Sequence, residues 1–223
     1  MPSEQVENYI KNIYKLQEQE KRVTTSLLSD KLQISAPSVS EMVRKLAEEG
    51  TVSYTPYKGV ELTSEGTRQA LKIIRRHRLW ELFLVEVLKY QWDEIDEEAE
   101  RLEHFMSEKL EERIDEALGF PRRDPHGDLI PTREGILEDR KHVPLSELEP
   151  GSKGIVSRVS DEHPEVLQYM SKLGIVLGTL VRISERIEFD GSLRAEIGSR
   201  EQFISAKLAQ NIFVEAKETV IVR

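Results

Sequence analysis

The chain has 223 residues, of which 33% are charged, and a net charge of −9. This composition predicts a soluble, acidic protein with room for one to three domains. Cysteine is absent, which excludes disulfides, zinc–thiolate sites and cysteine nucleophiles. No apolar run is long enough to cross a bilayer and no secretory leader opens the chain, so we expect a cytoplasmic protein without membrane contact.

Charge is distributed unevenly along the chain. Residues 1–78 contain 13 Lys or Arg and 10 Asp or Glu, a balance of +3. Residues 91–118 contain 3 basic and 12 acidic residues, a balance of −9. The first segment can therefore approach a polyanion, whereas the second is suited to holding cations.

The first elements in chain order predict a DNA-binding module. Helical spacing of apolar residues predicts a helix over residues 6–16, and capping residues precede two further helices over 27–32 and 35–50. Alternating residues at 51–54 and 60–63 predict a β-hairpin. This order is typical of a winged helix-turn-helix, although a tri-helical protein-interaction module is the alternative.

The third helix is the expected major-groove reader and the hairpin is the expected wing. Its exposed start carries small hydroxyls and charges that suit phosphate and base-edge contact. The candidate DNA-contact residues are Ser35, Ser38, Ser40, Glu41 and Arg44.

Two long amphipathic helices are expected next, one over residues 64–88 and an acidic one over 93–118. After a DNA-reading module, such helices usually build a dimer interface, because a dimer matches two half-sites. Residues 119–151, rich in Pro, Gly, Arg and Asp, predict a connector. A small β-barrel-like domain follows, with a helix at 165–173 and strands at 154–159, 181–184, 193–197, 202–205 and 212–215.

The acidic helix places Asp96, Glu100, Glu103 and His104 at i, i+4, i+7 and i+8, on one stripe. Clustered carboxylates repel one another unless a cation lies among them, so the stripe indicates a metal site; a solvated acidic face is the alternative.

His77 and Glu81 lie at i, i+4 on the preceding helix and can face the same partner. Oxygen and imidazole donors favour manganese or ferrous iron. Enzyme motifs such as a Gly-rich phosphate loop, a nucleophile elbow or H-E-x-x-H are missing from the sequence.

Six sequence motifs, in this order, resemble the diphtheria toxin repressor family of metal-dependent regulators, in particular its manganese-responsive branch. They are Tyr9-Ile-Lys-Asn-Ile13-Tyr14, Ser35-Ala-Pro37-Ser-Val-Ser40-Glu-Met-Val43, Tyr57-Lys-Gly59-Val-Glu-Leu-Thr63, His77-Arg-Leu79, Glu98-Ala-Glu100-Arg-Leu-Glu103-His104 and Pro125-His-Gly127-Asp-Leu-Ile-Pro131. The implied fold is mainly α with a small all-β domain: a winged helix-turn-helix at 1–64, a helical metal-binding and dimerisation domain at 65–140, and an SH3-like β-barrel at 141–223.

The resemblance implies a primary metal site at Glu100, Glu103 and His104 plus a ligand from the first helix, here Asn8. Manganese-type members have Asp there, whereas Asn8 offers only a neutral carbonyl oxygen. Lys11 also replaces an acidic residue seen in some relatives. Compensating carboxylates on the same helix would be Glu4 or Glu7.

A second implied site takes ligands from two helices and from the SH3-like domain. Its residues would be His77, Glu81, Asp96, Asp161, Glu162 and Glu165. The implied DNA contacts are Ser35, Pro37, Ser38, Ser40, Glu41 and, at the wing, Lys58.

The sequence thus predicts a homodimeric repressor of metal-homeostasis genes that binds palindromic operator DNA, with Mn²⁺ (or Fe²⁺) as co-repressor at two sites per subunit. Metal would hold the two recognition helices near one DNA turn apart, roughly 34 Å. One alternative is a winged-helix regulator that senses a small organic ligand, with the acidic stripe only solvated. Another is a carboxylate-bridged metalloenzyme.

Overall fold

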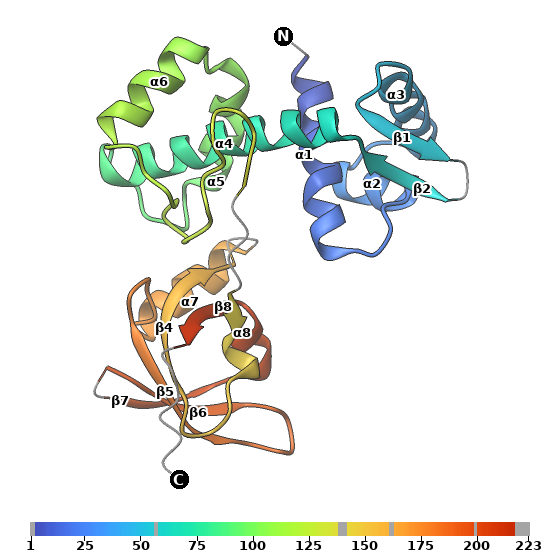
Figure 1. The fold of residues 1–223 in the computed structure, drawn as a ribbon. Helices are drawn as coiled ribbons and strands as arrows, with labels where there is room; N and C mark the ends of the chain where they lie inside the picture. Colours follow the sequence, from blue (N-terminus) through green and yellow to red (C-terminus); the bar gives the residue numbers. More distant parts are fainter. Residues whose placement is uncertain (1–2, 56–57, 138–141, 161–162, 199, 217–223) are drawn as a thin grey trace. The chain divides into compact units, whose positions relative to one another are not determined.

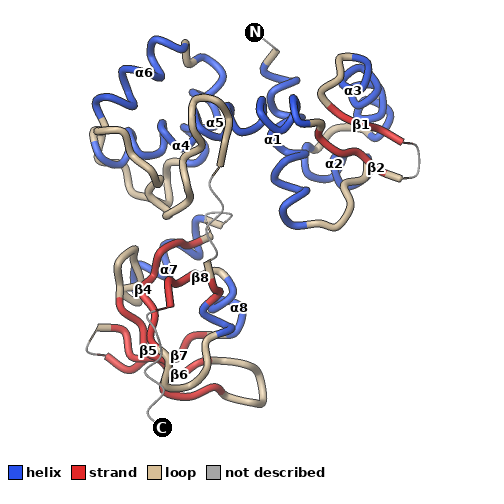
Figure 2. Tube along the Cα trace, viewed as in Figure 1, coloured by secondary structure: helices blue, strands red, loops and turns tan. Residues whose placement is uncertain are grey.

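A computed structural model describes residues 3–55, 58–137, 142–160, 163–198 and 200–216 (Figures 1 and 2). The chain forms two compact units. The first comprises Met1–Trp80, Ala99–Arg122 and Ile130–Glu138, and the second Glu81–Glu98, Arg123–Leu129 and Asp139–Arg223. The three-domain division at 64 and 140 therefore stays a prediction. Within the described ranges, no helix has the length and apolarity needed to cross a membrane.

The first unit opens with the expected winged helix-turn-helix. Its elements are α1 (Glu4–Gln19), α2 (Thr25–Leu32), α3 (Ala36–Glu48), β1 (Val52–Thr55) and β2 (Gly59–Leu62). Each helix begins after a hydroxyl side chain that accepts a backbone N–H, and these caps are Ser3, Thr24 and Ser35. The two strands pair antiparallel beside α2 and α3, as Figure 1 shows.

Helix α1 uses two opposite faces. Its apolar face lies in the core of the DNA-binding module and comprises Val6, Tyr9, Ile10, Ile13 and Leu16. Glu7, Asn8 and Lys11 lie on the other side of the helix, because each residue advances the direction of the side chain by about 100°. Glu7 and Lys11 are nevertheless buried, so this polar face also packs against the protein.

The acidic segment is not the single helix that was expected. The helices here are α4 (Ser64–Glu86), α5 (Asp96–Leu102) and α6 (Glu108–Ala117), with a 3₁₀ turn at Glu103–Phe105. Met106 is extended with its side chain buried, and the Ser107 hydroxyl then caps α6 by accepting from the Leu110 N–H. Glu103 and His104 thus lie in a tight turn, and the predicted stripe ends with α5.

The second unit contains a six-stranded antiparallel sheet in the order β3-β8-β4-β5-β6-β7 (red in Figure 2). Its strands are β3 (Val143–Pro144), β4 (Lys153–Val159), β5 (Leu180–Arg186), β6 (Leu193–Ile197), β7 (Arg200–Ile204) and β8 (Ile212–Ala216). Helices α7 (Pro164–Lys172) and α8 (Ala206–Gln210) accompany the sheet. The five expected strands and α7 are confirmed, whereas β3 and α8 were not expected.

Candidate metal centre

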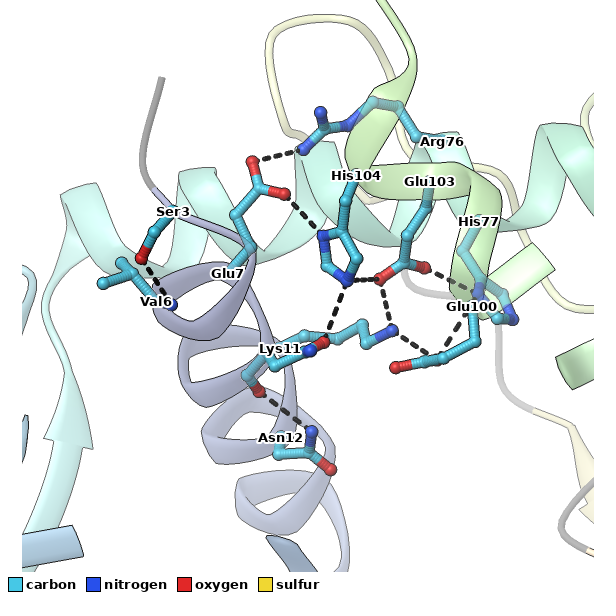
Figure 3. A network of polar contacts seen from close by, with 11 residues as sticks. Ser3, Val6, Glu7, Lys11, Asn12, Arg76, His77, Glu100, Glu103 and His104 are labelled. Carbon is cyan, nitrogen blue, oxygen red and sulfur yellow. Dashed lines mark hydrogen bonds and ion pairs between the residues drawn. The ribbon is translucent and has the colours of Figure 1, made fainter. Parts of the chain in front are cut away.

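The candidate centre is a polar cluster within the first unit, largely buried except for the half-exposed Glu100 (Figure 3). Three segments that are distant in sequence supply it: α1, the middle of α4, and the end of α5 with the turn that follows. Its residues are Glu7, Asn8, Lys11, Arg76, His77, Glu100, Glu103 and His104. The structure therefore brings the four predicted primary ligands into one cluster.

His104 faces Asn8 and Glu103. Its Nε2 lies 3.1 Å from Asn8 Oδ1 and 3.4 Å from Glu103 Oε1. Its Nδ1 lies 2.7 Å from the carboxylate of Glu7, to which it donates. In the neutral ring, the Nε2 lone pair then faces two oxygens, so three electron-rich atoms converge.

Glu7 orients His104 instead of joining the converging atoms. One of its oxygens accepts from His104, and the other is paired with the Arg76 guanidinium at 2.8 Å. All three side chains are largely shielded from water. A carboxylate that accepts from the outer nitrogen of a histidine fixes the tautomer and direction of a metal-ligating ring. Of the two compensating carboxylates that the sequence suggested, Glu7 is therefore at the site, in this supporting role.

Lys11 lies between two of the predicted ligands. Its Nζ is 2.6 Å from Glu100 Oε2 and forms an ion pair with Glu103 Oε1 (Figure 3). His77 Nδ1 lies 2.7 Å from the other Glu103 oxygen and 3.9 Å from Glu100 Oε2. His77, which the sequence assigned to the second site, thus contacts the primary cluster.

Glu103 is the most enclosed carboxylate of the cluster, with 0% of its surface exposed. Burial alone would raise the pKa of its carboxyl. The hydrogen bond and charge of His77, together with the ammonium of Lys11, instead hold that pKa below its ordinary value. Glu103 is therefore held as an anion that contacts partners on α1, α4 and its own turn.

The donors fit a divalent cation of intermediate hardness. They comprise carboxylates, imidazoles and one amide oxygen without sulfur, a set that suits manganese or ferrous iron. The spacings of 3.1 and 3.4 Å around His104 Nε2 are close to the roughly 3 Å between neighbouring ligands of an octahedral ion with bonds of about 2.1 Å. Asn8, Glu103 and His104 thus form a fitting set, while Lys11 pairs with Glu100 and also with the Glu103 oxygen that faces His104.

The predicted second site draws on residues of both compact units and stays a prediction. His77 and Glu81 lie one turn apart on α4, and Asp96 is the first residue of α5. Glu165 is exposed in the first turn of α7. Outside the described residues lie Asp161 and Glu162.

His126 is a buried polar residue that the sequence did not single out as a site residue. Its Nε2 lies 2.8 Å from the backbone oxygen of Trp92, and its Nδ1 lies 3.7 Å from Glu81 Oε1. Its ring also stacks on that of Trp92. The only signal for it was its place inside the Pro125-His-Gly127 motif, where nothing in the local pattern indicates a neighbour on α4.

The candidate DNA surface is built mainly on α3. Five of the expected contact residues are exposed, namely Ser35, Pro37, Ser38, Glu41 and Arg44, and Lys58 is exposed in the turn of the hairpin. The Ser35 hydroxyl caps the helix, and the half-buried Ser40 donates its hydroxyl to the Ala36 carbonyl at 2.9 Å. Glu41 and Arg44 on α3 and Lys58 in the hairpin turn are therefore the exposed charged residues among the expected DNA contacts.

Family models match along the chain in three consecutive pieces. The N-terminal DNA binding domain of the iron dependent repressors matches residues 1–60, and their metal binding and dimerisation domain matches 63–132. The FeoA domain matches 143–216. These matches agree with the winged helix-turn-helix, the polar cluster and the sheet.

Individual relatives agree with the models. The iron-dependent repressor IdeR of Mycobacterium leprae (strain TN) is 34% identical over 168 residues, covering 70% of this chain and 72% of the relative. The structure of a manganese-dependent transcriptional repressor in complex with manganese is 41% identical, with a TM-score of 0.88, and the match covers 95% of this chain and 100% of the other. The manganese regulator SloR is 34% identical, with a TM-score of 0.78, covering 97% and 100%.

A winged helix-turn-helix whose first helix also enters a carboxylate–imidazole cluster defines a DNA-binding regulator with a metal-binding domain. The chain belongs to the iron-dependent repressor family, which includes the diphtheria toxin repressor. The family resemblance, the fold class and the SH3-like nature of the C-terminal domain are confirmed.

Proposed function

We propose that this protein is a metal-dependent transcriptional repressor that binds a palindromic operator as a homodimer in the cytoplasm. Its co-repressor would be Mn²⁺ (or Fe²⁺), and its targets would be metal-homeostasis genes. The observation that carries the proposal is the convergence of Asn8 Oδ1, Glu103 Oε1 and His104 Nε2. The relatives named as iron- and manganese-dependent repressors support the same assignment.

The primary ion would be held by Asn8, Glu100, Glu103 and His104. Asn8 would bind from α1, and the others from α5 and the turn after it. Glu7 would keep the Nε2 of His104 directed at the site. When bound, the ion supplies positive charge that donors on both segments share.

Helix α1 would connect this site to DNA binding. Its apolar face is part of the core that supports α3, while its polar face carries Asn8. An ion that links Asn8 to His104 would hold the DNA-binding module against the turn at Glu103–Phe105, called the ligand turn below. A ligand that binds this arrangement better than a looser one shifts the population towards it.

A second ion per subunit would be held by His77, Glu81 and Asp96 with Asp161, Glu162 and Glu165. The one-turn spacing of His77 and Glu81 on α4 supports this proposal, because side chains at i and i+4 share a helix face.

The test uses metal-stripped, full-length protein and a duplex selected from a random-sequence pool in the presence of Mn²⁺. We expect fluorescence anisotropy to detect binding with Mn²⁺ or Fe²⁺ and none with chelator. Metal-independent binding by the stripped protein would overturn the mechanism. If the protein senses an organic ligand instead, joint replacement of Glu103 and His104 by Ala would leave operator binding unchanged.

A further inference from the structure

Lys11 carries an ammonium into the centre of a group of predicted metal ligands. Its side chain is buried, with 1% of the residue exposed. Lysine is almost never buried to this extent unless its charge is paired, and here both partners are carboxylates that the sequence assigned to a metal. The pairing therefore calls for an explanation of what the ammonium does there.

We propose that the Lys11 ammonium permanently occupies one cation position of the cluster. The cluster would consequently bind one divalent ion, at Asn8, Glu103 and His104, although its donor atoms could hold two. This inference rests on the proposed function and narrows its primary site: with Lys11 paired to Glu100, the ion would be held by Asn8, Glu103 and His104 without Glu100.

The geometry supports the proposal that Lys11 occupies a cation position. His77, Glu100 and Glu103 each offer a donor atom within 4.8 Å of the others, which is a metal-like grouping. Lys11 Nζ lies at the carboxylates of that same grouping. A divalent ion that bridged Glu100 Oε2 and Glu103 Oε1 would have to occupy the place of the ammonium, which already bridges these two oxygens, and two cations so close together repel strongly.

The charge balance supports the proposal that the cluster binds one divalent ion and not two. Glu7 is neutralised by Arg76, and a histidine that binds metal is neutral. Glu100 and Glu103 then supply the negative charge of the cluster, and Lys11 offsets half of it. One divalent ion added to this set leaves a single net positive charge. Two ions beside Lys11 would leave three positive charges in a site with a buried carboxylate, which is strongly unfavourable.

The ammonium also links two segments without metal. Lys11 belongs to α1, Glu100 to α5 and Glu103 to the turn that follows, so their ion pairs join α1 to the ligand turn. Metal binding would then strengthen a contact between α1 and the Glu103–Phe105 turn that the Lys11 ion pairs already make. It would not have to create that contact from carboxylates that repel one another.

The test compares metal-stripped, full-length wild type with Lys11→Glu and Lys11→Met. Lys21→Glu, the same charge change at an exposed lysine beyond α1, is the matched control. Bound Mn²⁺ is counted by equilibrium dialysis with elemental analysis, and electron paramagnetic resonance detects spin-coupled manganese pairs. Thermal unfolding of each metal-free variant checks that it folds.

We expect Lys11→Glu to bind one more Mn²⁺ per subunit than wild type and to show a coupled-pair spectrum that wild type and Lys21→Glu lack. Metal-free Lys11→Met should melt at a lower temperature than wild type. A coupled pair in wild type, or no additional ion in Lys11→Glu while wild type binds Mn²⁺, would overturn this inference alone. If wild type binds no Mn²⁺ and His104→Ala behaves identically, the proposed function fails as well.

Discussion

The carboxylate of Glu7 accepts a hydrogen bond from His104 Nδ1 at 2.7 Å, and this contact determines which ring nitrogen faces the site. We expect Glu7→Ala to weaken Mn²⁺ binding about 10- to 100-fold, as is usual when the orienting carboxylate of a ligand histidine is lost. Glu7→Gln, which retains an acceptor oxygen, should lose less. Titration with Mn²⁺ measures both effects, and Glu4→Ala, at an exposed position on the same helix, is the control. Unchanged affinity in Glu7→Ala would remove Glu7 from the site.

Asn8 contributes a neutral oxygen at a position where a carboxylate would bind a cation more strongly. Its Oδ1 already lies 3.1 Å from His104 Nε2, so Asn8→Asp needs no rearrangement to present an anionic donor. We expect this substitution to tighten Mn²⁺ binding about tenfold, and Asn8→Ala to weaken it by a similar factor. Competition with a fluorescent chelator gives the affinities. Identical affinities for both variants would show that α1 supplies no ligand through residue 8.

Arg44 and Lys58 are exposed cations on α3 and in the hairpin turn. If each contacts a backbone phosphate, replacing either with Ala should weaken operator binding and reduce the slope of log K against log salt by about one. Mn²⁺ affinity should not change, because neither residue belongs to the cluster. Anisotropy titrations at several salt concentrations test this, with the exposed Arg113 of α6 replaced by Ala as control. An unchanged salt slope for both would place the DNA surface elsewhere.

His142 makes the folding stability of the second unit depend on pH. Burial, followed by the charges of Arg123 and Arg158, lowers the pKa of its imidazole below the ordinary 6.5. The unfolded chain therefore takes up this proton at a higher pH than the folded chain does. The contribution of His142 to stability is thus present above pH 6.5 and is lost as the pH falls through the folded pKa.

We expect His142→Gln to lose less stability than wild type between about pH 7.5 and 5. Urea unfolding followed by Trp92 fluorescence in a Trp80→Phe background reports on the unit that contains His142. Parallel pH profiles for the two proteins would contradict the assignment.

Local signals predicted the elements that begin with a cap or a turn. Thr24 and Ser35 cap the helices that follow them because the capping bond involves residues only three positions apart. The break at Met106 could not be predicted in this way. The acidic segment keeps a helical period across it, and the break depends on Met106 being buried and on Ser107 capping the next helix.

The same distinction holds for the candidate site. The spacing of ligand-type residues in the sequence was enough to identify Glu103, His104 and His77 as candidates. The positions of Lys11 and Glu7 were not, because their contacts with Glu103 and His104 span 92 and 97 residues. A lysine or glutamate on an amphipathic helix is normally solvated, and only the fold shows that these two are enclosed.

The two-sided use of α1 has a consequence for how such proteins diverge. Positions 8 and 11 point away from the apolar residues that hold the DNA-binding module together. Under the proposed function, substitutions at these two positions would alter which cation the protein requires, and how many, without changing the apolar residues of α1 that support α3.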